Sequence, residues 1–248
     1  NEYLISRIGQ ISEKTTDILR DHVRSGLFEP EEFEFTFDEP ISDDVRFRGK
    51  IDRVDIYDGG DIFIKIIDYK SGSKKFSIKD IYAGVQLQLA AYMSSAVKAA
   101  KEKYKDRNVR PGGLYYYLIN DRYVRDQKEL ENKNRMSGVT LCEDQVIHAV
   151  DTTLGEEGRT KSNIVPVSLT QSGLSASSVI ANAGEMDSLI SFAGTKIREA
   201  GDRIKAGEID LAPYKGDTSH NGCSFCDYKD ICRFDAGSFG TDWRETDT

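Results

Sequence analysis

Two strand-like segments joined by a glycine turn constrain this chain more than any other feature. Residues 45–57 alternate apolar and polar side chains, and residues 62–67 form a nearly continuous apolar run. The sequence Asp-Gly-Gly-Asp at 58–61 separates them, which is typical of a tight β-hairpin turn. A continuous apolar run is typical of a strand buried on both faces. The pattern therefore predicts a hairpin whose second strand lies in the interior of a sheet.

Acidic side chains lie near the ends of this hairpin. Asp52 precedes the turn at Asp58 by six residues and Asp68 follows Asp61 by seven, so the two carboxylates fall close to cross-strand register. Lys70 is two residues beyond Asp68, so both side chains point to one side of the strand. Carboxylates, with the backbone carbonyl of Tyr69, are suitable ligands for Mg²⁺ or Mn²⁺. A lysine beside them can position water and stabilise charge on a phosphate, which predicts metal-assisted phosphodiester hydrolysis.

Further candidates lie on neighbouring elements. Residues 33–37 read as a short strand that carries Glu34, a possible third acid. Residues 80–104 read as a helix on which Gln88 and Tyr92, four residues apart, share one face. That pair could contact the DNA backbone or support the metal ligands. Taken alone, a glutamine on the surface and a tyrosine in the core would be the simpler interpretation.

The formal net charge of −8 argues against a simple DNA-coating protein. It does not exclude nucleic acid, because a site built of carboxylates contributes negative charge that a bound metal cancels. A basic cluster directly after the carboxylates favours contact with phosphate, whereas a second one between residues 98 and 110 reads more simply as a solvated face. The predicted DNA-binding side chains are those of Lys74, Lys75 and Lys79.

The remaining segments complete an α/β pattern within one domain of 248 residues. The expected fold is a mixed, mainly antiparallel central sheet flanked by helices, with an insertion at 120–185 and a cysteine-containing tail at 213–248. No apolar run approaches the roughly 20 residues that a membrane span requires. The other predicted elements are helices at 3–25, 143–150 and 186–207 and strands at 112–119 and 163–169.

Three of the four cysteines lie within ten residues of one another. So few cysteines in so long a chain do not form a secreted disulfide framework, and they favour a metal or cluster site in a reducing, cytoplasmic compartment. The spacing Cys223-x₂-Cys226-x₅-Cys232 suits Zn²⁺ or an iron–sulfur cluster, both of which usually take four ligands. Cys142 is the remaining thiol in this chain.

The order of these motifs resembles the RecB-type branch of the PD-(D/E)xK nuclease superfamily. The tail, with the segments at 137–141 and 163–169, is similar to the nuclease domains of the AddB (RexB) family, and the resemblance covers essentially the whole chain. The motifs that carry it are Glu34, Gly-Lys-Ile-Asp-Arg at 49–53, Asp-Tyr-Lys at 68–70, Gln-Leu-Ala-Ala-Tyr at 88–92 and the three cysteines of the tail.

This resemblance implies a restriction-endonuclease-like core and an Mg²⁺-dependent deoxyribonuclease. It implies an exonuclease that cuts single strands, the 5′-ended strand in particular, as a helicase delivers them from double-strand ends. It also implies recombinational repair as the context and an AddA-like helicase–nuclease subunit as the partner. By position, the resemblance assigns the catalytic triad to Asp52, Asp68 and Lys70, the upstream acid to Glu34, and the helix motif to Gln88 and Tyr92.

The same resemblance implies a [4Fe–4S] cluster on Cys223, Cys226 and Cys232. In that family the fourth thiolate and a metal-ligating histidine precede the nuclease core. His22 does not match that histidine well. We therefore expect a fragment of a longer protein in which the cluster is incomplete.

Two alternatives remain open at this point. One is a stand-alone RecB-like exonuclease, such as the Cas4-type proteins, which also carry cysteine clusters. The segments at 137–141 and 163–169 argue against it. The other is a catalytically idle DNA-binding or scaffold module, against which the intact Asp52, Asp68 and Lys70 argue.

Overall fold

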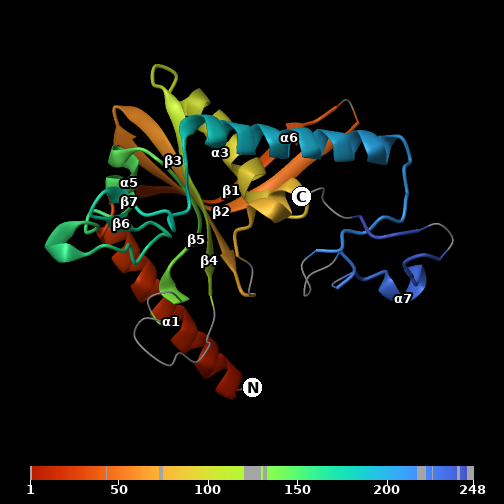
Figure 1. The fold of residues 1–248 in the computed structure, drawn as a ribbon, viewed down its shortest axis with the longest axis horizontal. Helices are drawn as coiled ribbons and strands as arrows, with labels where there is room; N and C mark the ends of the chain where they lie inside the picture. The colour runs from red at the N-terminus through yellow and green to blue at the C-terminus, as the bar shows by residue number, and fades with distance from the viewer. Residues whose placement is uncertain are drawn as a thin grey trace.

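The computed structural model describes residues 2–42, 44–72, 75–119, 130, 133–216, 222–224, 226–238 and 241–244. These residues build a six-stranded sheet in the order β1-β2-β3-β4-β5-β8, covered by helices (Figure 1). None of the described helices combines the length and the apolar character needed to cross a membrane. The strands of this sheet are β1 (Glu29–Pro40), β2 (Arg46–Gly59), β3 (Asp61–Lys70), β4 (Val109–Leu118), β5 (Ser137–Leu141) and β8 (Ile180–Ala181). The other elements are α1 (Glu2–Arg24), α2 (Ile78–Tyr82), α3 (Gln88–Lys103), α5 (Asp144–Val150), the 3₁₀ helix η1 (Glu156–Gly158), β6 (Leu169–Thr170), β7 (Gly173–Leu174), α6 (Ala183–Lys205) and α7 (Lys229–Cys232).

The predicted hairpin is confirmed. β2 and β3 pair in antiparallel register up to Gly59 and Asp61, and Gly60 between them has a φ of 97°, a conformation that glycine adopts without steric cost. β3 pairs with parallel β4 on its other side, so it lies inside the sheet. Among the described strands, β1–β2, β2–β3 and β4–β5 are antiparallel and β3–β4 and β5–β8 are parallel, which confirms a mixed, mainly antiparallel sheet.

Helices cover both faces of the sheet. α3 and α6 pack against each other on one face, and Figure 1 shows α6 running across the molecule above the strands. α1 packs against the opposite face, where the ring of His22 meets the ring of Tyr117 edge-on at 6.0 Å between centroids. Asp68 and Lys70 of β3 point toward α3, because successive side chains of a strand alternate between the two faces.

The helix predicted at 80–104 is in fact two helices, α2 and α3. Gly84 has a φ of 78°, which a right-handed helix excludes, and the chain turns there. The buried amide of Gln86 holds this turn by donating to the Lys75 carbonyl at 2.8 Å and accepting from the Ser77 N–H at 2.8 Å. These two hydrogen bonds tie the residue after the turn to the backbone just before α2.

The segment predicted as an insertion contributes to the central sheet. β5 pairs with β4, and β8 pairs with β5, so both strands are built into the core. The strand predicted at 163–169 is wrong for most of its length, because only Leu169 enters a strand, the short β6. Ser162 Oγ accepts hydrogen bonds from the N–H groups of Ile164 and Val165 and so takes the place of a strand partner.

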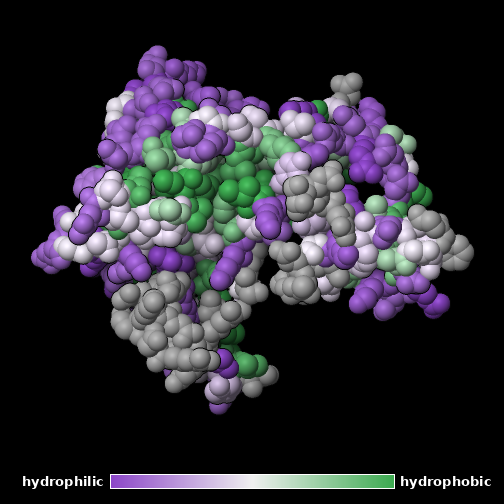
Figure 2. All heavy atoms as spheres, in the orientation of Figure 1, coloured by the Kyte–Doolittle hydropathy of each residue, from purple (hydrophilic) through white to green (hydrophobic). Residues whose placement is uncertain are grey.

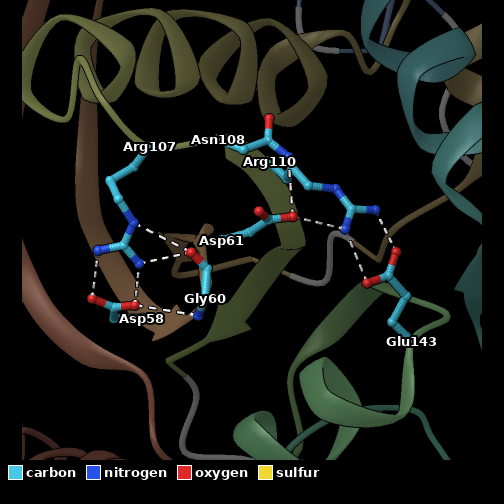
Figure 3. Close-up of polar contacts among 7 residues, drawn as sticks. All are labelled: Asp58, Gly60, Asp61, Arg107, Asn108, Arg110 and Glu143. Atoms are coloured by element: carbon cyan, nitrogen blue, oxygen red, sulfur yellow. Dashed lines mark hydrogen bonds and ion pairs between the residues drawn. The ribbon is translucent and has the colours of Figure 1, made fainter.

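Two arginines form hydrogen bonds with the tip of the β2–β3 hairpin (Figure 3). Arg107 donates to the Asp58 carboxylate at 3.1 Å and to the Gly60 carbonyl at 2.7 Å. Arg110 donates to Asp61 at 3.3 Å and to Glu143, the residue before α5, at 3.0 Å. Both arginines belong to the basic cluster between residues 98 and 110, so this part of the cluster has a structural role. Such partly exposed pairs contribute about 0–1 kcal/mol each.

The α1 face of the sheet holds a buried ionic cluster. Asp55, which is fully buried, accepts two hydrogen bonds from Arg53 at 2.6 and 2.7 Å, and Lys65 lies 2.9 Å from the same carboxylate. The Lys65 ammonium also lies 4.8 Å from the centre of the Phe28 ring. Burial lowers the pKa of Lys65, and the Asp55 carboxylate opposes that shift. The charged form of each of these three side chains is therefore stabilised by its opposite charge in the cluster.

His22 of α1 faces this positive cluster and makes stability depend on pH. The pKa of His22 is lowered to about 4, mainly by burial and also by the charges of Lys65 and Arg53, whereas Asp151 and Asp21 oppose the shift. Among the described residues, His22 Nδ1 has no hydrogen-bond partner. An unfolded histidine has a pKa of about 6.5 and binds a proton first. Stability is therefore complete above about pH 6.5 and falls between about pH 6.5 and 4, by roughly 3 kcal/mol at most.

We expect the substitution His22→Leu to flatten this dependence. The measurement is the free energy of unfolding in urea at a series of pH values between 4 and 8. The exposed His148 of α5 provides the matched control, and His148→Leu should keep the slope of the unmodified chain. An equal slope for His22→Leu and the unmodified chain would show that His22 is not the titrating group.

Candidate active site

Asp68, Lys70 and Gln88 form a closed triangle of polar contacts at the end of β3. The Lys70 ammonium lies 2.6 Å from Asp68 Oδ2 and donates to Gln88 Oε1 at 2.9 Å. Gln88 Nε2 donates to Asp68 Oδ1 at 2.8 Å. Asp68 is only 2% exposed, so its charge sits in a low-dielectric environment where paired contacts are strong. The predicted placement of Asp68 and Lys70 on one face is confirmed.

Gln88 therefore belongs to this site. It begins α3, and its amide also lies 3.2 Å from the hydroxyl of Tyr92, one helical turn further on. The Tyr92 ring packs edge-on against Phe37 of β1 at 5.5 Å between centroids. A Cβ atom on Gly49 would come within 2.4 Å of the Phe37 ring and 2.9 Å of Tyr92. Glycine at this position thus permits the close approach of the Phe37 and Tyr92 rings.

Asp52 approaches the same end of β3 from β2. The last pair of the β2–β3 ladder is Arg53 with Ile67, so Asp52 comes next opposite Asp68. The Asp52 carboxylate accepts the Tyr69 N–H at 2.7 Å. The N–H and C=O of one strand residue point to the same neighbouring strand, so the Tyr69 carbonyl also points toward β2. The near-register placement of the two aspartates is confirmed.

Glu34 stands apart from the two aspartates. It lies between Phe33 and Phe35, which pair with Arg53 and Ile51, and its carboxylate forms an ion pair with Lys50. Its φ of 56° is rare for a residue with a side chain and costs about 1–3 kcal/mol. In the described part of the chain, no three His, Cys, Asp or Glu side chains come together as a metal site. Glu34 therefore does not complete a third ligand position in this conformation.

Tyr116 is part of the site, although the sequence did not predict it. It pairs in register with Asp68 on β4, and the Lys70 ammonium lies 5.6 Å from the centre of its ring. Burial raises the pKa of the Tyr116 hydroxyl, and the neighbouring Asp68 charge raises it further. The aromatic run on β4 was visible in the sequence, but the parallel pairing that aligns it with Asp68 was not.

The predicted DNA-binding lysines are placed in part. Lys75 lies just before α2 and Lys79 within it, and both are exposed to solvent. Lys74 lies outside the described residues. The two described lysines follow the site in the chain, which leaves them accessible to a charged ligand.

The donor set of this site fits a hard divalent cation. Two carboxylates, from Asp52 and Asp68, stand on adjacent strands, and the Tyr69 carbonyl is directed to the same edge. Oxygen donors of this kind suit Mg²⁺ and Mn²⁺, which commonly bind through one or two carboxylates, with the remaining positions left to water and substrate phosphate.

The three tail cysteines share one hollow but are not arranged as a metal site. Cys223, Cys226 and Cys232 line a cavity of about 710 Å³ and form no disulfide. They do not converge into a ligand group in this structure. Cys142 lies elsewhere, since its N–H donates to Ala181 of β8 at 2.8 Å, and Figure 1 shows the neighbouring α5 on the opposite side of the molecule from α7. The residues present therefore do not fit a four-ligand cluster here.

We expect Gln88→Leu to lower the rate of the reaction at this site by roughly 10- to 100-fold, the typical effect of losing a group that orients a ligand. Leucine preserves the bulk but removes both hydrogen bonds that hold Asp68 and Lys70. Because Gln88 acts through these residues, the pH profile of the rate should also shift. The exposed Gln145→Leu on α5 is the control. Wild-type rate and pH profile in Gln88→Leu would contradict this role.

Comparison with known proteins identifies the family of this chain. The family model of the PD-(D/E)XK nuclease superfamily matches residues 1–233. One relative, named as a subunit of an ATP-dependent helicase/deoxyribonuclease, comes from Lachnoclostridium phytofermentans. It is 32% identical over 257 residues, which cover 99% of this chain and 22% of the relative. Proteins of the same name from Alkaliphilus metalliredigens and Listeria monocytogenes are 34% and 31% identical and cover 94% and 98% of the chain. The chain spans 22% to 23% of the length of these three relatives. On this evidence the chain belongs to the PD-(D/E)XK nuclease superfamily.

Proposed function

We propose that this chain is a divalent-metal-dependent deoxyribonuclease domain that hydrolyses the phosphodiesters of single-stranded DNA as an exonuclease. The observation that carries the proposal is the contact triangle of Asp68, Lys70 and Gln88, placed opposite Asp52 at the end of β3. Metal-assisted phosphodiester hydrolysis needs a carboxylate pair with a positioned lysine. A catalytically idle DNA-binding or scaffold module does not need this arrangement, so the intact site favours a nuclease.

The side chains divide the work in the proposed reaction. Asp52, Asp68 and the Tyr69 carbonyl would hold Mg²⁺ or Mn²⁺, which neutralises charge on the phosphate and favours attack by water. Lys70 positions that water and stabilises the charge that develops on the phosphate. Gln88 and Tyr92 fix the orientation of Lys70 and Asp68. Glu34, the proposed upstream acid, forms an exposed ion pair with Lys50 on the adjacent strands β1 and β2.

The relatives supply the proposed context. They are named as one subunit of an ATP-dependent helicase/deoxyribonuclease, and the matched region is about a fifth of each. We infer that this domain works with an AddA-like helicase–nuclease partner in the cytoplasm, on strands that a helicase separates at double-strand ends during recombinational repair. The strand cut here would be the 5′-ended one. Lys75 and Lys79, which are exposed after the site, would contact the incoming phosphates, together with Lys74.

An iron–sulfur cluster on the tail is a separate part of the proposal. The spacing of Cys223, Cys226 and Cys232 and their shared cavity support a [4Fe–4S] cluster, although the three thiols would have to move together to bind it. Anaerobic reconstitution with iron and sulfide tests this point. In a longer form of the protein that includes the upstream thiolate, a broad iron–sulfur absorbance that disappears in Cys226→Ser would support the assignment, and no absorbance in that form would contradict it.

The experiment that tests the proposed function is cleavage of a labelled oligonucleotide. We expect the chain to cut single-stranded DNA when Mg²⁺ or Mn²⁺ is added, to stop when a chelator is added, and to cut the matching duplex much more slowly. Labels at the 5′ or the 3′ end distinguish exonuclease from endonuclease products and report the direction. Metal-independent cleavage, or no cleavage with either ion, would contradict the proposal.

A further inference from the structure

An apolar groove lies beside the candidate active site and contains none of its residues. The groove has a volume of about 720 Å³ and runs between α2 and the N-terminal half of α6. Figure 2 shows hydrophobic surface gathered in this region, beneath α6. The side chains that form its walls include Phe76, Ile78, Ile81, Tyr82, Leu189 and Phe192.

Large side chains in this groove are exposed to water. Ile78 is 62% exposed and Tyr82 is 56% exposed. The ring of Tyr82 stacks on the ring of Phe192, with 5.6 Å between centroids and 12° between planes. Two parallel rings from two different helices form a platform to which a further flat ring can add, and nucleic-acid bases stack on aromatic side chains in this way.

The groove opens on the same face of the sheet as the catalytic residues. Val139, which lines it, is in register with Leu114 and through it with Ile66, and Ile66 shares the face of Asp68. Ser137 is in register with Tyr116, which is in register with Asp68, so two strand spacings, about 10 Å, separate Ser137 from Asp68.

A residue of the groove wall follows the active site closely in the sequence. Phe76 follows Lys70 by six residues, and its N–H donates to Ser137 Oγ at 2.9 Å. The wall of the groove is thus anchored two strands away from Asp68. A polymer that runs from Asp68 across β4 and β5 would therefore reach the groove.

Positive charge accompanies the apolar platform. Lys79 follows Ile78 in α2, and the Lys196 ammonium lies 5.5 Å from the centre of the Phe192 ring, while also pairing with Glu199. Glu185, an acid in the groove wall, is engaged in the capping box of α6 with Asn182. Stacking rings flanked by lysines match a ligand with flat bases and a charged backbone.

We propose that the α2–α6 groove holds unpaired bases of the DNA strand whose phosphodiester lies at Asp68, with a base stacked on the Tyr82–Phe192 platform. This inference rests on the proposed nuclease function and adds to it the place where the unpaired bases of the substrate bind. Bases in a duplex are already stacked and paired and cannot enter, so the groove would select single strands next to the cut.

The test compares two oligonucleotides of equal length and charge, one of deoxythymidines and one without bases. Binding is measured by fluorescence anisotropy in the Lys70→Met background with Mg²⁺, so that the strand stays intact. Tyr82→Ala and Phe192→Ala should weaken binding of the deoxythymidine strand about 10-fold or more and leave the abasic strand unchanged. Tyr82→Phe keeps the ring and should bind like its parent. Tyr228→Ala removes an exposed tyrosine of the tail and serves as the control.

If the Lys70→Met protein with and without Tyr82→Ala binds the deoxythymidine strand with equal affinity, the inference is overturned. A protein partner would then be the better candidate for the groove. Equal loss on both oligonucleotides would also overturn it, because bases would then not be involved. The nuclease proposal is separable from this result. If the groove binds bases but the chain with Lys70 intact cuts no DNA, only the nuclease proposal is refuted. If the chain cuts DNA but its binding does not depend on bases, only the groove proposal is refuted.

Discussion

Lys70→Met is expected to reduce cleavage of single-stranded DNA by about 10³-fold while the chain remains folded. Methionine fills the space of the lysine stem but carries no charge, so the phosphate loses the ammonium that lies between Asp68 and Gln88. Removing one such preorganised donor from an active site typically costs about 10²- to 10³-fold in rate. Single-turnover cleavage with excess protein measures this directly, because product release does not then limit the rate.

Lys101→Met is the matched control for this experiment. Lys101 is exposed on α3, well along the helix from Gln88, and its replacement removes the same charge from the chain. We expect it to cut at the unmodified rate. A Lys70→Met protein that retains cleavage within a few-fold of the Lys101→Met protein would show that Lys70 has no part in the chemistry.

Asp55→Ala is expected to destabilise the fold by about 3–5 kcal/mol, because it leaves two buried cations without their carboxylate. Arg53 is 4% exposed and Lys65 is 5% exposed, so water cannot replace the lost partner. Urea unfolding followed by circular dichroism gives the free energy. Replacing Asp55, Arg53 and Lys65 together with apolar residues of similar volume should recover much of this loss.

Asp61→Ala provides the comparison for the Asp55 experiment. Asp61 is also paired with an arginine, Arg110, but it is partly exposed, so its removal should cost only about 0–1 kcal/mol. A loss below about 1 kcal/mol for Asp55→Ala would mean that the buried cations find other partners or that Lys65 loses its proton.

The hairpin and the face that carries Asp68 and Lys70 were predictable because their signals are local. Period-two alternation, a Gly-Gly turn and an Asp-x-Lys spacing each depend on residues close in sequence, and β2, β3 and the Asp68–Lys70 pair followed from them. Gln88 could be suspected from its helical spacing to Tyr92. Its contacts with Asp68 could not, because they depend on how α3 packs on β3.

The parts that escaped prediction depend on tertiary structure. The break before α3 is set by Gly84 and by the amide of Gln86, which pairs with backbone eleven residues away. Tyr116 joins the site only through the parallel pairing of β3 with β4. The left-handed backbone of Glu34 is invisible in a sequence where the residue reads as an ordinary strand position. β5 and β8 lie in a segment whose polar clusters predict an insertion, yet they complete the sheet.

The central claim is that Asp52 and Asp68 together bind the metal used to cut DNA. The most direct test is the single-turnover rate of single-strand cleavage as a function of Mg²⁺ concentration for Asp52→Asn, Asp68→Asn and the control Asp61→Asn, which changes an aspartate of β3 outside the site. We expect Asp61→Asn to keep the Mg²⁺ dependence of the unmodified chain and the other two variants to lose cleavage at every concentration. Cleavage by Asp52→Asn and Asp68→Asn with unchanged rate and Mg²⁺ dependence would contradict the claim.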